Sequence, residues 1–332
     1  MNNENAQSTR FYGFDLLRGI SAFLIIGCHL GIKTTPSCTL LFRYNQCAVE
    51  VFGAISGFLL SQSICSSKPL LNILSGRIKR LLPLLIGWTL VYIILLSILD
   101  MAFGVPSNYI QKILSPRALL SAFFRGSAEI HLWFLASLLY LSIAVTVADR
   151  IVPTFFKHGL AYLVLSAIIL GVSAFIPRSH VMFLQNRHIQ HFANYDLRLL
   201  AFMFIGIGIH RLYILRIFNR LHYFLLSSLI VVTIFYWFAY EHIHRYILDF
   251  VLVSLTLIVF SDRCFHYSRI TAFLSSTSLC VYLIHPLFSR ILSIFSKCLI
   301  KDAANIAQTI TIWGGIYSLS VLFSIVYNRK LR

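Results

Sequence analysis

Two polar side chains in the first apolar segment, Arg18 and His29, have the types and the spacing for chemistry on a phosphorylated substrate. They are eleven residues apart, and eleven residues of an α-helix leave only about 20° beyond three full turns. The two side chains therefore share one helix face, separated by roughly 16 Å along the axis. A guanidinium binds phosphate through two parallel hydrogen bonds, and an imidazole titrates near neutral pH and suits proton abstraction. The alternative is a snorkelling arginine and a histidine that caps the helix end.

A group of cations, Arg77, Lys79 and Arg80, directly precedes the apolar segment that begins at Leu82. Three positive charges near the start of a helix suit a phosphate group. A basic cluster before a membrane span is also what retention of cytoplasmic loops produces. The residues alone favour this topological role, with a phosphate site as the alternative. In the first segment, Asp15 precedes Arg18 by three residues and can pair with it.

Glu50 and Trp133 are further candidates at the ends of apolar segments. Glu50 lies at the expected outer end of the second segment, where it either orients His29 or is solvated. Trp133 opens the fourth segment, a place where tryptophan usually anchors a helix at the membrane interface. The Ser56-Gly57 pair in the second segment predicts tight helix packing.

Histidines and cysteines elsewhere give weaker signals. His285 follows Tyr282 and precedes Pro286 within one apolar segment, which predicts a kinked helix with a structural hydrogen bond. Cys38 and Cys47 share one expected outer loop, either as a disulfide or as two thiols. Other histidines gather in outer loops without nearby cysteines or carboxylates, so no metal site is expected. These are His180, His188, His191, His242 and His244.

The elements that position these residues must be membrane-spanning helices. Of the 332 residues, 58% are hydrophobic and 12% are charged, and the mean hydropathy is +0.80. A soluble domain carries about 25% charged residues, so lipid is the expected solvent. The apolar runs do not alternate as barrel strands do, which predicts an all-α polytopic bundle of about ten helices. The expected spans are 12–31, 46–63, 82–99, 132–149, 159–176, 197–213, 221–240, 246–261, 271–295 and 307–327. We expect one membrane domain over residues 1–332, with no appended soluble domain.

The formal net charge of +17 follows from Lys and Arg spread in small groups between the apolar runs. This pattern favours anionic lipid headgroups as partners over nucleic acid. Segments on the side of the N-terminus hold more Lys and Arg than those on the opposite side, and ten spans return the chain to the same side. We therefore expect both termini in the cytoplasm.

In order along the chain, these residues resemble the acyltransferase-3 family of membrane acyltransferases, whose members O-acylate bacterial surface polysaccharides. Each motif alone is weak, but five in the family's order over nearly the whole chain are specific. The Arg-x10-His motif is matched by Asp15 to Gly19 with His29, the Ser-Gly-Phe segment by Val49 to Phe58, and the Arg-x-x-Arg element by Arg77 to Arg80 with Pro83. The Trp-Phe-Leu helix is matched by His131 to Leu135, and the Tyr-Leu-Ile-His-Pro signature ends Ser278 to Pro286. Gly53-Ala54 departs from the larger residues usual in the second motif, and we expect no hydrolase-like domain after the last span.

The resemblance implies an O-acyltransferase, most often an O-acetyltransferase, in the bacterial inner (cytoplasmic) membrane. It implies acyl-CoA, usually acetyl-CoA, as a cytoplasmic donor substrate rather than a permanently bound cofactor, and a surface or lipid-linked glycan as acceptor. It assigns the donor phosphates to Arg18, Arg77 and Arg80. It makes His29 a general base or a covalent acyl carrier, with Glu50 orienting it and Trp133 lining the acceptor side. No metal is implied.

Two other function classes use the same polar residues. A transporter or flippase for an acylated or lipid-linked envelope molecule would use them as a pathway, and inverted repeats, which we do not find, would favour it. A catalytically silent scaffold in a glycan-assembly complex is the third class, and the intact set of arginines and His29 weighs against it. The acceptor glycan, the acyl length and the oligomeric state are not set by these patterns.

Overall fold

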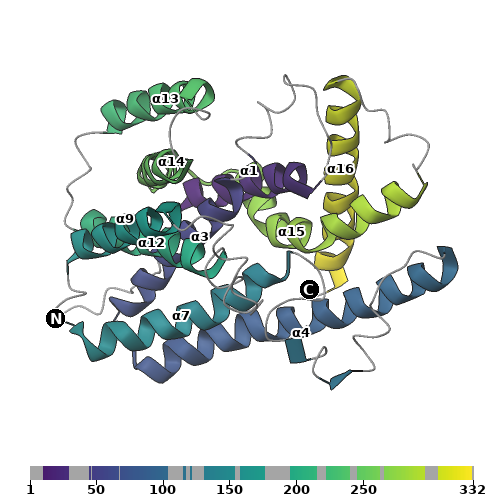
Figure 1. Cartoon of the computed structure of the whole chain (residues 1–332), viewed down its shortest axis with the longest axis horizontal. Helices are drawn as coiled ribbons and strands as arrows, with labels where there is room; N and C mark the ends of the chain where they lie inside the picture. Colours follow the sequence, from purple (N-terminus) through teal and green to yellow (C-terminus); the bar gives the residue numbers. More distant parts are fainter. Residues whose placement is uncertain are drawn as a thin grey trace.

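The computed structural model describes residues 10–29, 45, 47–66, 68–103, 115–116, 120–121, 131–153, 158–175, 195–214, 222–239, 245–261, 265–295 and 306–330. Ten long helices lie in this part of the chain (Figure 1). They are α1 (Tyr12–His29), α3 (Cys47–Ile64), α4 (Leu70–Phe103), α7 (Trp133–Ile151), α9 (Gly159–Phe175), α12 (Leu197–Ile214), α13 (His222–Ala239), α14 (Arg245–Phe260), α15 (Arg269–Phe295) and α16 (Ile306–Lys330). The all-α bundle expected from the apolar segments is confirmed.

Four of the described helices are long and apolar enough to cross a membrane by length and composition. They cover Cys47–Ile64, Leu70–Leu99, Trp133–Ile151 and Arg269–Ile291. Three shorter apolar stretches, Gly159–Ser173, Ile247–Phe260 and Thr311–Val326, lie in α9, α14 and α16. The length and composition of these helices indicate a membrane protein.

Helix α4 begins at Leu70, well before the expected start at Leu82. The amides of Asn72 and Ile73 donate to the carbonyl of Pro69, which closes the first turn there. Leucine, arginine and lysine, which are good helix formers, make up most of residues 70–82, so this stretch continues the helix instead of preceding it. The expectation of a helix start beside Arg77 to Arg80 is wrong, because these residues lie about two turns inside α4.

Helices α3 and α12 pack at close range because glycines face each other's backbone. A Cβ at Gly57 would collide with the carbonyl oxygen of Met203, and a Cβ at Gly206 with that of Ala54. Small residues permit such close approach between membrane helices. The tight packing expected at Ser56-Gly57 is confirmed. Helix α12 lies between α3 and α9, while α1 packs against α15.

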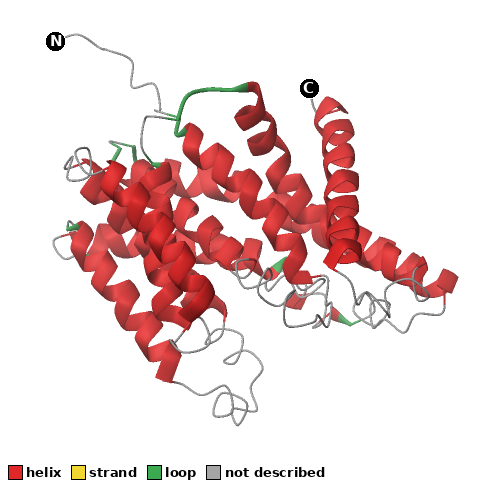
Figure 2. Cartoon of the chain, turned by 90° about the horizontal axis from the view of Figure 1, so that it is seen from above, coloured by secondary structure: helices red, strands yellow, loops and turns green. Residues whose placement is uncertain are grey.

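One end of the bundle gathers basic side chains, and we call it the arginine-bearing end. Here Arg150 Nη2 donates to the carbonyl of Lys68 at 3.2 Å, which joins the end of α7 to the start of α4. Arg211 Nη2 lies 2.5 Å from Asp149 Oδ1 and joins the end of α12 to α7. Figure 2 shows the described elements of the bundle as helices joined by loops.

Candidate functional site

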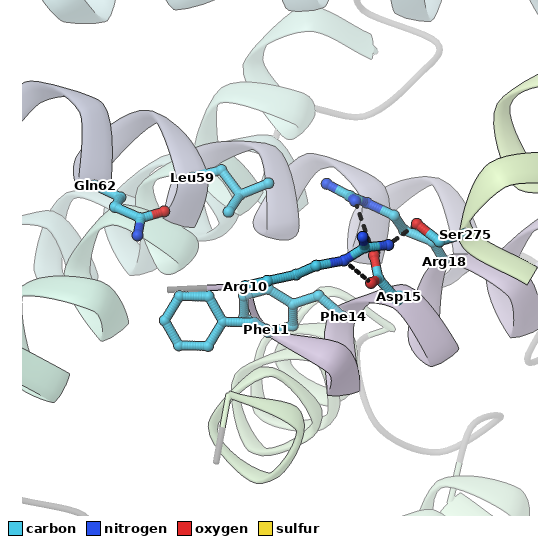
Figure 3. Close-up of a pocket in the computed structure, with 8 residues that line it drawn as sticks. All are labelled: Arg10, Phe11, Phe14, Asp15, Arg18, Leu59, Gln62 and Ser275. Carbon is cyan, nitrogen blue, oxygen red and sulfur yellow. Dashed lines mark hydrogen bonds and ion pairs between the residues drawn. The ribbon is translucent and has the colours of Figure 1, made fainter. Parts of the chain in front are cut away.

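The carboxylate of Asp15 organises the arginine-bearing end of α1 (Figure 3). Arg10 Nε donates to Oδ2 at 2.7 Å, and the hydroxyl of Ser275 donates to Oδ1 at 2.6 Å. Arg18 Nη1 lies 3.5 Å from the same Oδ1, so the expected pairing of Asp15 with Arg18 is confirmed. Because hydrogen bonding favours the charged guanidinium, the contact with Asp15 raises the pKa of Arg10 above its usual value.

A cavity of about 290 Å³ opens around this carboxylate. Its walls come from the start of α1, the last turns of α3 and the start of α15. Arg10 and Gln62 are among its polar lining residues. The complete lining is Arg10, Phe11, Phe14, Asp15, Arg18, Leu59, Gln62 and Ser275.

A second cavity, of about 250 Å³, brings together Arg18, Arg77 and Arg80. Arg18 comes from α1 and the other two from α4, and the charges of Arg18 and Arg77 each interact unfavourably with that of Arg80. Arg18, Leu59 and Ser275 line both cavities, so Arg18 belongs to the wall between them. Three guanidinium groups held together against their mutual repulsion form a site suited to a polyanion.

The second cavity is charged and exposed at one end and apolar and buried at the other. At one end Arg80 and Ser276 are exposed, and at the other Phe134 and Tyr282 are only 5% and 4% exposed. On α15, Ser275 and Tyr282 mark the two ends, and seven residues of helix cover about 10 Å. The remaining lining residues are Phe52, Ser56, Leu59, Leu81, Leu84, Leu135, Leu138, Ser278 and Leu279. A charged group fits the exposed end and a narrow apolar arm the buried end.

His29 is the last residue of α1, so one continuous helix carries both Arg18 and His29. This confirms the helical register on which their shared face was predicted. The side chain of His29 lies outside the described residues. Its assignment as the catalytic group stays a prediction.

Glu50 belongs to a buried charge cluster that joins three helices. It forms an ion pair with Arg198 of α12, and Arg198 Nη2 also lies 3.1 Å from Asp249 Oδ2 of α14. The thiol of Cys47 donates to Asp249 Oδ1 at 3.2 Å. Glu50 is 4% exposed, so the alternative of a solvated carboxylate is wrong. Its contact with His29 stays a prediction, and Cys38, the other half of the expected disulfide alternative, lies outside the described residues.

The ligand atoms of Cys47, Glu50 and Asp249 lie within 4.8 Å of one another, a spacing that could hold a metal ion. The guanidinium of Arg198 pairs with both carboxylates of this group. A metal ion would compete with this built-in cation for the same oxygens. The cluster therefore suits a structural role in joining α3, α12 and α14.

Trp133 begins α7, and its ring lies 5.1 Å from that of Tyr195. It is not among the described residues that line the two cavities. Tyr282 donates to the carbonyl of His131 at 2.5 Å, and α15 continues through Pro286. The structural hydrogen bond expected in this segment is confirmed. The expected outer-loop histidines all lie outside the described residues.

Several residues of this region did not emerge as site candidates from the sequence. Arg10 and Ser275 bind Asp15, and a run of hydroxyls from Ser275 to Ser278 in an apolar segment was a visible signal. Arg198 and Asp249 lie inside expected spans, where a charged side chain is costly, and this placement was a visible signal. Which residues they pair with could be predicted only with knowledge of which helices are neighbours.

Comparison with known families tests the resemblance. A family model described as an acyltransferase domain, that of the acyltransferase-3 family, matches residues 11–329. The match covers all ten described helices except the last residue of α16. Comparisons with curated proteins and with solved structures gave no match. The chain belongs to the acyltransferase-3 family and is a membrane acyltransferase.

Proposed function

We propose that the protein is an O-acetyltransferase of the bacterial inner membrane. It moves the acetyl group of cytoplasmic acetyl-CoA to a hydroxyl of a surface or lipid-linked glycan. The observation that carries the proposal is the convergence of Arg18, Arg77 and Arg80 on one cavity with a buried apolar end. Acetyl-CoA has the matching form, because its phosphates are at one end and its acyl group is at the end of a slender arm.

The arginine-bearing end faces the cytoplasm in this proposal, and both termini lie there. The three arginines bind the donor phosphates, and Arg10 adds a fourth cation beside Arg18. The arm enters the cavity of about 250 Å³, which is slightly smaller than the ~300–1,000 Å³ of pockets for drug-sized ligands. The nucleotide end therefore remains among the arginines while the acyl end enters the bundle.

His29 carries the chemistry in one of two ways. As a general base, it takes the proton of the acceptor hydroxyl while the oxygen bonds to the thioester carbonyl carbon. The C–S bond then breaks, and the proton passes to the departing thiolate of coenzyme A. As a covalent carrier, the imidazole first takes the acyl group and releases coenzyme A as the thiol, and the hydroxyl then takes the acyl group. Glu50 orients His29, and Trp133 lines the acceptor side.

The test compares surface polysaccharides by mass spectrometry from wild-type cells, cells lacking the gene, and the latter complemented with His29→Ala. We expect one acyl group per modified residue to vanish on deletion and to stay absent with His29→Ala. Complementation with His266→Ala, which alters an exposed histidine before α15, restores the acyl group. Equal glycan masses in all strains would contradict surface-glycan acylation and favour transport of an envelope molecule.

A further inference from the structure

Three aromatic rings lie together at the buried end of the second cavity. Phe52 comes from α3, Phe134 from α7 and Tyr282 from α15, and all three line the cavity. The ring centroids are 6.3 Å apart for Phe52 and Phe134, 6.0 Å for Phe52 and Tyr282, and 5.6 Å for Phe134 and Tyr282. Each separation lies in the contact range of aromatic pairs, so the rings form a closed triangle. We call these three residues the aromatic triangle.

Two residues of the aromatic triangle are bonded to one carbonyl oxygen, Tyr282 through its hydroxyl and Phe134 through its backbone amide. The hydroxyl of Tyr282 donates to the carbonyl of His131 at 2.5 Å, and the amide of Phe134 donates to the same oxygen at 3.3 Å. The imidazole of His131 packs edge-on against Tyr92 at 4.9 Å. The hydroxyl of Tyr92 in turn donates to the carbonyl of Leu283 at 2.6 Å. Phe134 and Tyr282 therefore belong to a hydrogen-bonded frame that joins α4, α7 and α15.

Phe52 differs from the other two rings because it is partly exposed, while they are buried. It lies on the face of α3 that also presents Ser56 and Leu59 to the cavity. From Leu59 to Phe52 the helix covers about 10 Å, the same depth as on α15. Phe52 is partly exposed and lies outside the hydrogen bonds to the His131 carbonyl, so shortening it disturbs the buried frame least.

We propose that the aromatic triangle sets the acyl length of the donor and restricts it to short chains such as acetyl. The inference rests on the proposed function, in which the acyl end of the arm enters this cavity. A longer chain must displace a ring that is closely packed against the other two, which is costly in a protein interior. The aromatic triangle is then the specificity-determining wall of the donor site.

The experiment measures kcat/KM for acetyl-, propionyl-, butyryl- and hexanoyl-CoA with wild-type enzyme, Phe52→Leu and Phe52→Ala in membranes. We expect wild type to lose about tenfold or more in kcat/KM between acetyl and butyryl, a size typical of steric discrimination. Phe52→Ala is expected to accept butyryl as well as acetyl, with Phe52→Leu in between. Phe288→Ala is the matched control, because it removes a ring from α15 that does not line the cavity.

Three results would overturn the inference while leaving the proposed function intact. They are wild-type use of hexanoyl-CoA as efficient as that of acetyl-CoA, an unchanged length preference in Phe52→Leu or Phe52→Ala, and an equal shift in Phe288→Ala. If Phe52→Ala does not accumulate in membranes, the smaller change Phe52→Leu decides. An absence of acyl transfer by wild type from every donor, by contrast, contradicts the proposed function itself.

Discussion

The hydroxyl of Ser275 donates a 2.6 Å hydrogen bond to Asp15, a residue 260 positions earlier in the chain. This bond connects α15 to α1 at the point where Arg18 approaches the same carboxylate oxygen. Gly19 makes the approach of the two helices feasible, because a Cβ there would press against the side chain of Leu274. Asp15 therefore fixes the guanidinium of Arg18 in the wall shared by the two cavities.

Asp15→Asn should weaken donor binding more than it slows turnover. Asparagine preserves the shape of the side chain but replaces the ion pairs with Arg10 and Arg18 by weaker contacts to a neutral amide. We expect KM for acetyl-CoA to rise about tenfold and kcat to stay within about twofold, because no reacting group is altered. Steady-state kinetics in membranes measure both. Ser275→Ala should give a smaller rise in KM, and a fall in kcat with unchanged KM would contradict this role for Asp15.

The arginine cluster should recognise the phosphates of the donor and nothing else. A truncated donor, S-acetylpantetheine, carries the same thioester without phosphate groups. Arg77→Gln and Arg80→Gln are each expected to lower kcat/KM for acetyl-CoA about 10- to 100-fold and to leave that for S-acetylpantetheine nearly unchanged. The measurement is a comparison of both donors with each variant.

Lys79→Gln is the matched control for this comparison. Lys79 lies between the two arginines on α4, carries the same charge and does not line either cavity. We expect the variant to keep its kcat/KM for both donors. If the arginine variants lost both donors equally, the arginines would support the fold or the chemistry instead of binding phosphate.

Arg198→Met should destabilise the bundle strongly. The change leaves the buried carboxylates of Glu50 and Asp249 without their shared cation, and removal of one partner from a buried ion pair costs about 3–5 kcal/mol. Thermal unfolding in detergent is the measurement. Arg150→Met, at an exposed arginine on α7, should change the free energy of unfolding by less than about 0.5 kcal/mol. Adding Glu50→Gln and Asp249→Asn to Arg198→Met should restore part of the loss, and no restoration would contradict an electrostatic origin.

The helices were predictable from the sequence because polar residues bound each apolar run, including the three shorter runs in α9, α14 and α16. The pairing of Asp15 with Arg18 was predictable too, since it depends only on spacing within one helix. The convergence of Arg18 with Arg77 and Arg80 depends on which helices are neighbours, and hydrophobic patterns do not specify that. The same holds for Glu50, whose partner Arg198 lies on a helix far along the chain.

The start of α4 was misplaced for a different reason. Hydropathy indicates where a helix enters lipid, whereas the residue at which the helix begins depends on the helix propensity of the residues there. Arg77, Lys79 and Arg80 are charged but favour helix and lie among leucine and isoleucine, so α4 begins well before the span expected from residue 82. The error moved the basic cluster from a helix start to a helix face. That face is what places both arginines in the wall of the cavity.

Two glycine-to-alanine substitutions should show separately how close helix packing and intrinsic helix propensity affect the free energy of unfolding. Gly206→Ala directs a methyl group at the backbone oxygen of Ala54, so α3 and α12 must move apart. We expect a loss of about 1–3 kcal/mol in the free energy of unfolding, as for other overpacked interiors. Gly171→Ala on α9 is the control, because beyond its chain neighbours and its own helix backbone no atom lies within 4 Å of the added methyl group. Alanine there should be neutral or stabilise the helix by up to about 1 kcal/mol. Equal unfolding temperatures in detergent for the two variants would show that the contact between α3 and α12 tolerates a wider spacing than the glycines indicate.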